Sequence, residues 1–369
     1  MKTKLIRVIL FFTIVLIIPF FTLFGEKEKV SYNENKVLAE FPKFSFAGYK
    51  SRSFMNGVSD FFSDHFVLRE TFIKAKNSIE KAIGKTEING VIEINGNLIQ
   101  TFRDVDYKLT DKNLIALNKL KAKNADTPFY FIPVITAQEK MESEIPSYLA
   151  VESEKDYIDY CFGKLKEINS VDVSDAIIST EYAFYRTDHH WTTESAFNSY
   201  CVVADALGFT PKSKDFFSIE TVADDFNGTL YSKTLNEKID PDSIEFYRSS
   251  TDFTLTVKDE TYSSLYFKDW LKEKDKYSFF LNGNHGVCRI ENKSANGKLL
   301  VIKDSYANCI LPFLAEHYAE ITVVDPRYCS HSQIKDICVE DFDAVITLFN
   351  VSGFSQEQNF SLIEFMGGK

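Results

Sequence analysis

The chain has 369 residues, of which 44% are hydrophobic, and a net charge of −11 at pH 7. An acidic chain with no cluster of lysines and arginines is a poor partner for a phosphate backbone, so we expect no nucleic-acid partner. The 34 phenylalanines supply enough apolar side chain for one large core or two smaller ones. Composition therefore indicates a globular protein and leaves its substrate open.

Residues 8–24 are almost wholly apolar and follow Lys2, Lys4 and Arg7. The run is long for a signal peptide, and no small-residue cleavage motif follows it. We interpret it as an uncleaved membrane anchor with its start in the cytoplasm and the remainder of the chain outside. A cleaved signal peptide is the main alternative, and a buried N-terminal helix is a weaker one.

Hydrophobic periodicity predicts alternating helices and strands along the rest of the chain. Two Asn-Gly turns within 87–100 predict a hairpin. Helices are expected over 53–84 (broken near Asp64), 111–124, 153–165, from 193 onward, 306–318, 333–338 and 356–365. Strands are expected over 128–135, 171–173, 250–258, 298–303, 321–324 and 344–349. The β-α-β order of the last ninety residues predicts an α/β fold with a parallel sheet flanked by helices.

Six cysteines are spread widely, and none belongs to a C-x-x-C motif. That spacing does not fit a zinc site, and small buried core residues are the favoured interpretation, with disulfides as the alternative. The six are Cys161, Cys201, Cys288, Cys309, Cys329 and Cys338.

The segment 184–191, F-Y-R-T-D-H-H-W, is the main candidate for chemistry. In an extended chain, Asp188 and His190 would share one face and His189 would point the other way. An aspartate that orients a histidine leaves the second ring nitrogen free to act as a base. The alternative is a metal site formed by these three residues, which we disfavour because adjacent histidines diverge on a strand. We expect no metal and no cofactor.

Ser305 follows the strand K-L-L-V-I-K and precedes a predicted helix. Active sites of open α/β sheets form at the carboxyl ends of strands, so its hydroxyl could be the nucleophile that the base requires. Its own N–H, near a helix N-terminus, could stabilise an oxyanion. Serine is also a frequent helix N-cap, which is the alternative role.

The motifs Y-R-T-D-H-H-W-T, V-I-K-D-S-Y-A-N, P-F-L-A-E-H-Y and V-V-D-P-R-Y together resemble the DHHW family of bacterial proteins. That family is related to the alginate O-acetyltransferases, whose catalytic domains are similar to SGNH hydrolases. The resemblance implies an SGNH-like fold and a triad of Asp188, His190 and Ser305. It also implies a polysaccharide acceptor and a membrane-bound O-acyltransferase partner that delivers the acetyl group. Lys303 departs from the G-D-S pattern, which is expected to alter the turn and the oxyanion geometry.

Further residues are candidates for oxyanion or substrate binding. The loop residues Asn282, Gly283 and Asn284 could supply oxyanion donors, or they could form an ordinary turn. Tyr306 directly follows the serine and is placed with the same group. Arg327 could bind a substrate carboxylate, or it could pair with Asp325 or Asp304.

Trp191 could stack on a sugar, or its ring could cover the core. The apolar run and the positive charges before it predict an anchor or signal segment at 1–25, followed by a juxtamembrane linker at 26–50, with the remainder held outside the cytoplasm by a single span. The resemblance implies that 51–369 is an SGNH-like catalytic domain. The favoured function is an extracytoplasmic polysaccharide O-acetyltransferase. Two alternative functions stay open. One is a carbohydrate esterase with the same triad, and the other is a non-catalytic assembly or binding protein.

Overall fold

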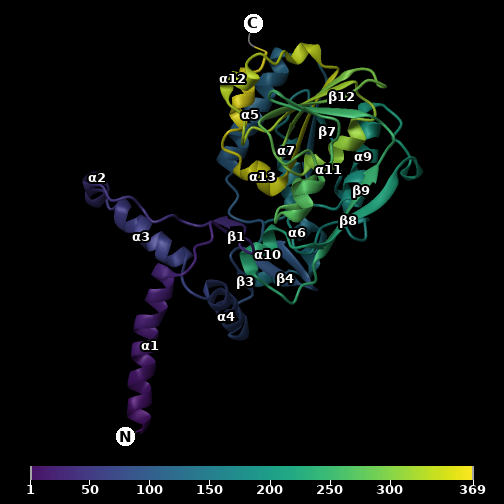
Figure 1. Cartoon of the computed structure of the whole chain (residues 1–369). Coiled ribbons are helices and arrows are strands. Elements are labelled where there is room, and N and C mark those ends of the chain that lie inside the picture. Colours follow the sequence, from purple (N-terminus) through teal and green to yellow (C-terminus); the bar gives the residue numbers. More distant parts are fainter. Residues whose placement is uncertain (1, 368–369) are drawn as a thin grey trace. The chain divides into compact units, whose positions relative to one another are not determined.

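The computed structural model describes residues 2–367. The chain divides into two compact units (Figure 1). The first contains the residues up to 89 together with 231–237, and the second contains 90–230 together with 238–369. Each unit is described by itself below.

The first unit begins with the apolar helix α1 (Lys2–Phe24). Its segment Lys4–Phe24 is long and apolar enough to cross a membrane, and a signal sequence has the same properties. The predicted linker 26–50 contains a short hairpin and a short helix. The remaining elements are β1 (Val30–Ser31), β2 (Lys36–Val37), α2 (Phe46–Lys50), α3 (Ser53–Asp64), α4 (Arg69–Ala82) and β3 (Glu87–Ile88).

The second unit holds the main sheet and its helices. Its strands are β4 (Val91–Ile94), β5 (Asn97–Gln100), β6 (Phe129–Val134), β7 (Asn169–Ser170), β8 (Ser218–Phe226), β9 (Asp242–Arg248), β10 (Phe253–Val257), β11 (Glu260–Tyr262), β12 (Val287–Asn292), β13 (Lys298–Lys303), β14 (Glu320–Val324) and β15 (Ala344–Asn350). Its α-helices are α5 (Tyr107–Lys123), α6 (Ala137–Lys140), α7 (Glu154–Phe162), α8 (Ser174–Ile178), α9 (Thr193–Leu207), α11 (Ala307–Leu314), α12 (His331–Ile334) and α13 (Val351–Gln356). Helix α10 (Thr229–Thr234) contains residues of both units.

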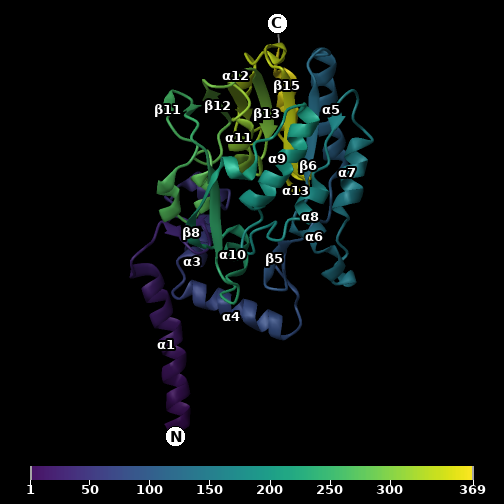
Figure 2. The same cartoon turned by 90° about the vertical axis from the view of Figure 1, so that its right-hand side faces the viewer.

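Eight strands form the main sheet in the order β11-β10-β12-β14-β13-β15-β6-β7. The section from β14 to β7 is parallel, and β12, β10 and β11 extend it in antiparallel fashion. Helices α5, α12 and α13 cover one face, and α9 and α11 cover the other (Figure 2). The expected α/β class with a helix-flanked parallel sheet is confirmed, with the antiparallel edge as an addition.

The parallel centre is apolar on both faces, as the continuous hydrophobic runs predict. Strand β13 is buried from Leu299 to Lys303, and every residue of β15 is buried. These strands have no alternating polar residues because helices cover both of their faces. The observed bounds of β13 are those predicted from the sequence.

Several predicted elements have other bounds in the structure, and three of them show the physical reason. The strand at 171–173 is instead β7, at Asn169–Ser170, because the chain leaves the sheet to begin α8 at Ser174. The helix at 333–338 starts earlier, at His331, where a capping box fixes it. The closing helix at 356–365 is two pieces, α13 and a 3₁₀ helix at Phe360–Phe365, because Asn350 caps α13 directly after β15.

All six cysteines are free. Three of them are buried, in agreement with the favoured interpretation, and the other three are partly exposed. The buried ones are Cys161, Cys288 and Cys309.

The carboxyl ends of the central parallel strands lie at one edge of the sheet. Ser305 follows β13, Asp325 follows β14, Asn350 ends β15, and Thr136 follows β6. Side chains from distant parts of the sequence therefore meet at this edge.

Candidate functional site

The D-H-H segment lies on a tight loop and not on an extended strand. Phe184 and Trp191 form an isolated antiparallel bridge that closes the loop. The chain then enters α9, whose N-cap Thr192 accepts a hydrogen bond from the Ser195 N–H at 3.3 Å. The loop is therefore fixed both by its own bridge and by the helix that follows it.

A buried carboxylate, Asp242, fixes the start of this loop from β9. Its Oδ2 accepts hydrogen bonds from the N–H and Oγ1 of Thr187 at 2.8 and 2.5 Å. Its Oδ1 accepts from the N–H of Arg186 at 2.8 Å and from the Tyr182 hydroxyl. Asp242 could not be identified from the sequence, because its contact with Thr187 spans 55 residues and has no local signature.

Asp188, His190 and Ser305 form a continuous hydrogen-bonded chain. Asp188 Oδ1 accepts from the backbone N–H of His190 at 3.0 Å and lies 2.5 Å from its Nδ1. The Oδ2 atom accepts from the N–H of Thr229 at 2.7 Å. Nε2 of His190 lies 2.8 Å from Ser305 Oγ, although the two residues are 115 positions apart. A separation of that size is suited to proton transfer between a hydroxyl and an imidazole.

This chain of groups is almost completely shielded from solvent. Ser305 is 6% exposed and His190 is 5% exposed. The His190 ring stacks on Tyr277 with centroids 3.7 Å apart and planes 10° from parallel. Burial is the largest cause that lowers the pKa of His190 to about 4; His189 adds to it and Asp188 opposes it. His190 is therefore neutral, as a base must be.

Asp188 carries the charge of the pair. Burial alone would raise the pKa of this carboxyl, but the two imidazoles and their hydrogen bonds hold it well below its usual range. An ionised Asp188 fixes the proton of His190 on Nδ1 and leaves Nε2 to accept.

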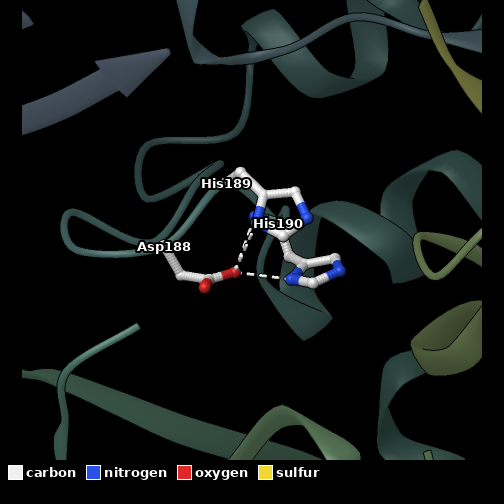
Figure 3. Close-up of side chains that lie close together, drawn as sticks. All are labelled: Asp188, His189 and His190. Carbon is white, nitrogen blue, oxygen red and sulfur yellow. Dashed lines mark hydrogen bonds and ion pairs between the residues drawn. The ribbon is translucent and has the colours of Figure 1, made fainter. Parts of the chain in front are cut away.

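His189 does not point away from Asp188, so the expected divergence is wrong. Its Nδ1 lies 3.5 Å from the same Oδ1 atom, and its ring centroid lies 3.9 Å from that of His190 (Figure 3). The physical reason is the bend of the loop, since side chains alternate faces only on an extended chain.

Asp188, His189 and His190 also present ligand atoms within 4.8 Å of one another. Both ring nitrogens of His190 and both oxygens of Asp188 already take part in hydrogen bonds. A metal ion would have to replace the Nδ1 bond that orients His190. The donor set therefore fits a hydrogen-bonded pair better than a metal centre.

Asp304 fixes the turn that carries Ser305. Its Oδ1 accepts from the N–H of Tyr306 at 2.9 Å, and its Oδ2 accepts from the N–H and Nδ2 of Asn350 at 2.8 and 2.6 Å. These bonds tie the ends of β13 and β15 together. Ser305 is not a helix N-cap, because α11 begins at Ala307 after Tyr306. Within residues 2–367, the Ser305 N–H donates to no other backbone group.

The backbone of the loop at 281–284 has more left-handed residues than an ordinary turn requires. Leu281, Asn282 and Gly283 have φ values of +57°, +59° and +85°, so three successive residues are left-handed. For a branched side chain such as Leu281 this conformation is strained, and strain of this kind is concentrated at functional sites. Asn282 Oδ1 accepts from Nε1 of Trp270 at 2.6 Å, which holds the loop.

Lys303 stands where the G-D-S pattern has glycine, and it connects this loop to the turn that carries Ser305. Its buried Nζ donates to Asn284 Oδ1 at 2.9 Å and to Asn308 Oδ1 at 2.7 Å, and lies 3.3 Å from Asp325. Nδ2 of Asn308 donates to the same Asn284 oxygen at 3.1 Å. Arg327 forms a two-bond pair with Asp325, at 2.9 and 2.7 Å, which is one of the two pairings that the sequence left open.

Trp191 and Tyr306 do not have the expected substrate roles. Trp191 is fully buried, and its Nε1 donates to the Tyr306 carbonyl at 2.9 Å, so no ring face is available to a sugar. Tyr306 is also buried; its hydroxyl donates to the His189 carbonyl and its N–H donates to Asp304. Both residues therefore position the two halves of the site against each other.

A hollow of about 20 Å³ lies beside the shielded groups at the carboxyl ends of β6, β13 and β15. Its lining includes His189, Tyr306, Asn350 and Thr136. The space is about that of one water molecule. His189 thus lies at the boundary between the shielded pair and this hollow.

Comparison with known proteins supports the resemblance seen in the motifs. The DHHW protein family model matches residues 176–324, which include the D-H-H loop, the 281–284 loop and Ser305. A crystal structure of a DHHW family protein from Eubacterium siraeum is 26% identical with a TM-score of 0.64, over 77% of this chain and 98% of that one. No curated protein matches the chain.

Bacillus cereus PatB1 has a similar fold. Its structure with a sulfonyl adduct is 17% identical with a TM-score of 0.60, over 75% of this chain and 99% of that one. A second PatB1 structure is 19% identical with a TM-score of 0.59 and the same coverage. At these identities the likeness concerns the fold.

Gly228 is predicted to be required for the position of Asp188. An added Cβ would lie 2.2 Å from Asp188 Cβ and 2.4 Å from its Oδ2, so Gly228→Ala must displace the carboxylate from His190. We expect the rate of Ser305 modification by phenylmethylsulfonyl fluoride, followed by mass spectrometry, to fall roughly 100-fold. Gly163→Ala is the control, since its nearest atom would lie 3.4 Å away. Equal rates in the two folded variants would contradict the assignment.

The pH dependence of the same modification tests the state of His190. Because the pKa of His190 is lowered to about 4, the neutral base is present above that pH, and the rate should fall only as pH approaches about 4. His189→Gln removes a neighbouring imidazole that lowers this pKa, so the acidic limb should move upward. A limb near the ordinary histidine value of 6.5 in both proteins would show that the pKa of His190 is not lowered by its surroundings.

Proposed function

Because residues 176–324 carry the DHHW family region, we propose that the chain is an extracytoplasmic O-acetyltransferase that transfers acetyl groups to hydroxyls of a polysaccharide. One observation carries the proposal: Ser305 Oγ lies 2.8 Å from Nε2 of His190, whose Nδ1 lies against Asp188. The acceptor class follows from the resemblance of the motifs to the alginate O-acetyltransferases.

The first half-reaction forms an acyl-enzyme. His190 Nε2 takes the hydroxyl proton of Ser305 as Oγ bonds to the carbonyl carbon of an acetyl donor. The bond to the donor's leaving group then breaks, and His190 returns the proton to that group. Asp188 stabilises the imidazolium that exists between these two proton transfers.

The second half-reaction transfers the acetyl group. A sugar hydroxyl gives its proton to His190 and bonds to the carbonyl carbon, and the bond to Ser305 Oγ breaks with return of the proton. The products are an O-acetyl sugar and free Ser305, so no cofactor or metal is consumed. The proposed donor partner is a membrane-bound O-acyltransferase, and helix α1 is the proposed single-span anchor.

Two donors are available in the proposed oxyanion hole. The N–H of Ser305 donates to no other backbone group of the described residues. Asn284 Oδ1 accepts hydrogen bonds from Lys303 Nζ and Asn308 Nδ2, and these bonds fix the rotamer of the amide. The Nδ2 hydrogens of Asn284 take no part in those bonds and are the second proposed donor. Donors that are fixed before the reaction stabilise the developing charge without reorganisation.

The shielding of the pair favours transfer over hydrolysis. A covalent acetyl ester survives until a sugar arrives only where water is excluded. Ser305 and His190 retain only 6% and 5% exposure, so little of either residue is open to bulk water. This shielding supports the proposal of transfer over the esterase alternative.

Ser305→Ala should abolish acetyl transfer from a synthetic acetyl ester to an oligosaccharide. Loss of a triad nucleophile costs on the order of 10⁶-fold, so only the small residual rate that substrate binding and the oxyanion donors supply should remain. Ser250→Ala, which changes an exposed serine, should leave the rate unchanged. Product is measured by mass spectrometry with and without the acceptor. Undiminished transfer would remove Ser305 from the mechanism, and free acetate as the main product despite acceptor would favour the esterase.

Asn284→Asp tests the oxyanion donor separately from the fold. The aspartate keeps the shape and both acceptor bonds to Lys303 and Asn308, but it has no N–H donor. We expect kcat to fall by about 10²–10³-fold with little change in KM. Asn284→Ala should lose a similar amount. Full activity of the Asn284→Asp protein would show that this amide does not contact the oxyanion.

A further inference from the structure

Helix α4 exposes an apolar stripe along its outer face. Leu68 is 65% exposed, Phe72 52%, Ile79 62% and Ile83 78%. Phe72 and Ile79 are seven residues apart within the helix and so lie on one side of it, and Leu68 and Ile83 directly flank its two ends. A contiguous apolar face of this kind indicates a surface that is covered in the working protein.

The opposite face of α4 is polar and is bound within the same unit. Asn77 is buried, and its Nδ2 donates to the Thr234 carbonyl at 2.8 Å. Lys74 Nζ lies 2.5 Å from Glu237 Oε1. The amphipathic pattern is therefore inverted, because the polar side faces the protein and the apolar side faces outward.

The apolar stripe begins beside the end of α1. The Val67 N–H donates to Thr22 Oγ1 at 3.3 Å, so the chain that enters α4 contacts the last turn of the apolar helix. A hollow of about 620 Å³ at this junction is lined by Phe21, Phe66 and Leu68, among others. The Phe66 and Phe72 rings pack edge to face with centroids 5.4 Å apart.

We propose that α4 lies in the surface of the membrane that α1 crosses, with Leu68, Phe72, Ile79 and Ile83 among the lipids. Lipid is the proposed partner of the apolar stripe, because the stripe is continuous with the end of α1, the proposed membrane-crossing helix. At 14 residues α4 is about 21 Å long, which is too short to span a hydrocarbon core but suits a helix parallel to the surface. The inference rests on the proposed anchor and is independent of the acyl-transfer chemistry.

Photo-crosslinking of the full chain tests this surface. The chain is reconstituted in nanodiscs of phosphatidylethanolamine and phosphatidylglycerol, with Phe72→p-benzoylphenylalanine as the probe. Ser78→p-benzoylphenylalanine is the matched control, because Ser78 is exposed on the same helix but lies off the stripe. After illumination, lipid adducts are identified by mass spectrometry. Labelling of Ser305 by phenylmethylsulfonyl fluoride, measured on the same samples, reports the proposed active site separately.

We expect roughly tenfold more lipid adduct at position 72 than at position 78, and loss of that excess when Ile79→Lys and Ile83→Lys are added. Both lysine changes are at exposed positions, so the fold should be retained. Crosslinked dimers at position 72 would overturn the proposal in favour of a second copy of the chain. Equal adduct at the two positions, or none, would overturn it as well.

Discussion

The site depends on buried carboxylates that hold two distant segments in fixed conformations. Asp304 ties the serine turn to the end of β15, and Asp242 ties the start of the D-H-H loop to β9. Each carboxylate accepts two backbone N–H bonds and further bonds from side chains, which compensates for its removal from water. With both segments fixed, Ser305 Oγ and His190 Nε2 meet at 2.8 Å.

Lys303 shows how the chain manages without the glycine of the G-D-S pattern. The residue ends β13, and the turn itself is built by Asp304, so no left-handed residue is required at position 303. Its side chain is instead directed into a polar network with Asn284, Asn308 and Asp325. Burial lowers the pKa of the Lys303 ammonium and Asp325 opposes that effect. The substitution thus changes the support of the proposed oxyanion loop and leaves the turn intact.

Local sequence patterns predicted much of this fold and part of the site. The run K-L-L-V-I-K gave the bounds of β13, and the D-x-H pattern with a serine after a strand identified the groups that meet. Contacts between distant residues could not be predicted in this way. Asp242 and Asn350 act through partners 55 and 46 positions away. The role of Trp191 stayed open because a motif does not reveal whether a ring faces solvent or the core. The direction of His189 was predicted wrongly because the loop bends.

The burial of Ser305 has a consequence for the proposed acetyl transfer. Ser305 Oγ and His190 Nε2 already lie 2.8 Å apart, so the proposed chemistry does not wait for a catalytic group to move into place. A sugar polymer must still reach the hydroxyl of a residue that is 6% exposed. In the proposed reaction, access of the acceptor would therefore limit turnover, and His189, which lines the adjoining hollow, would be placed to select among acceptors.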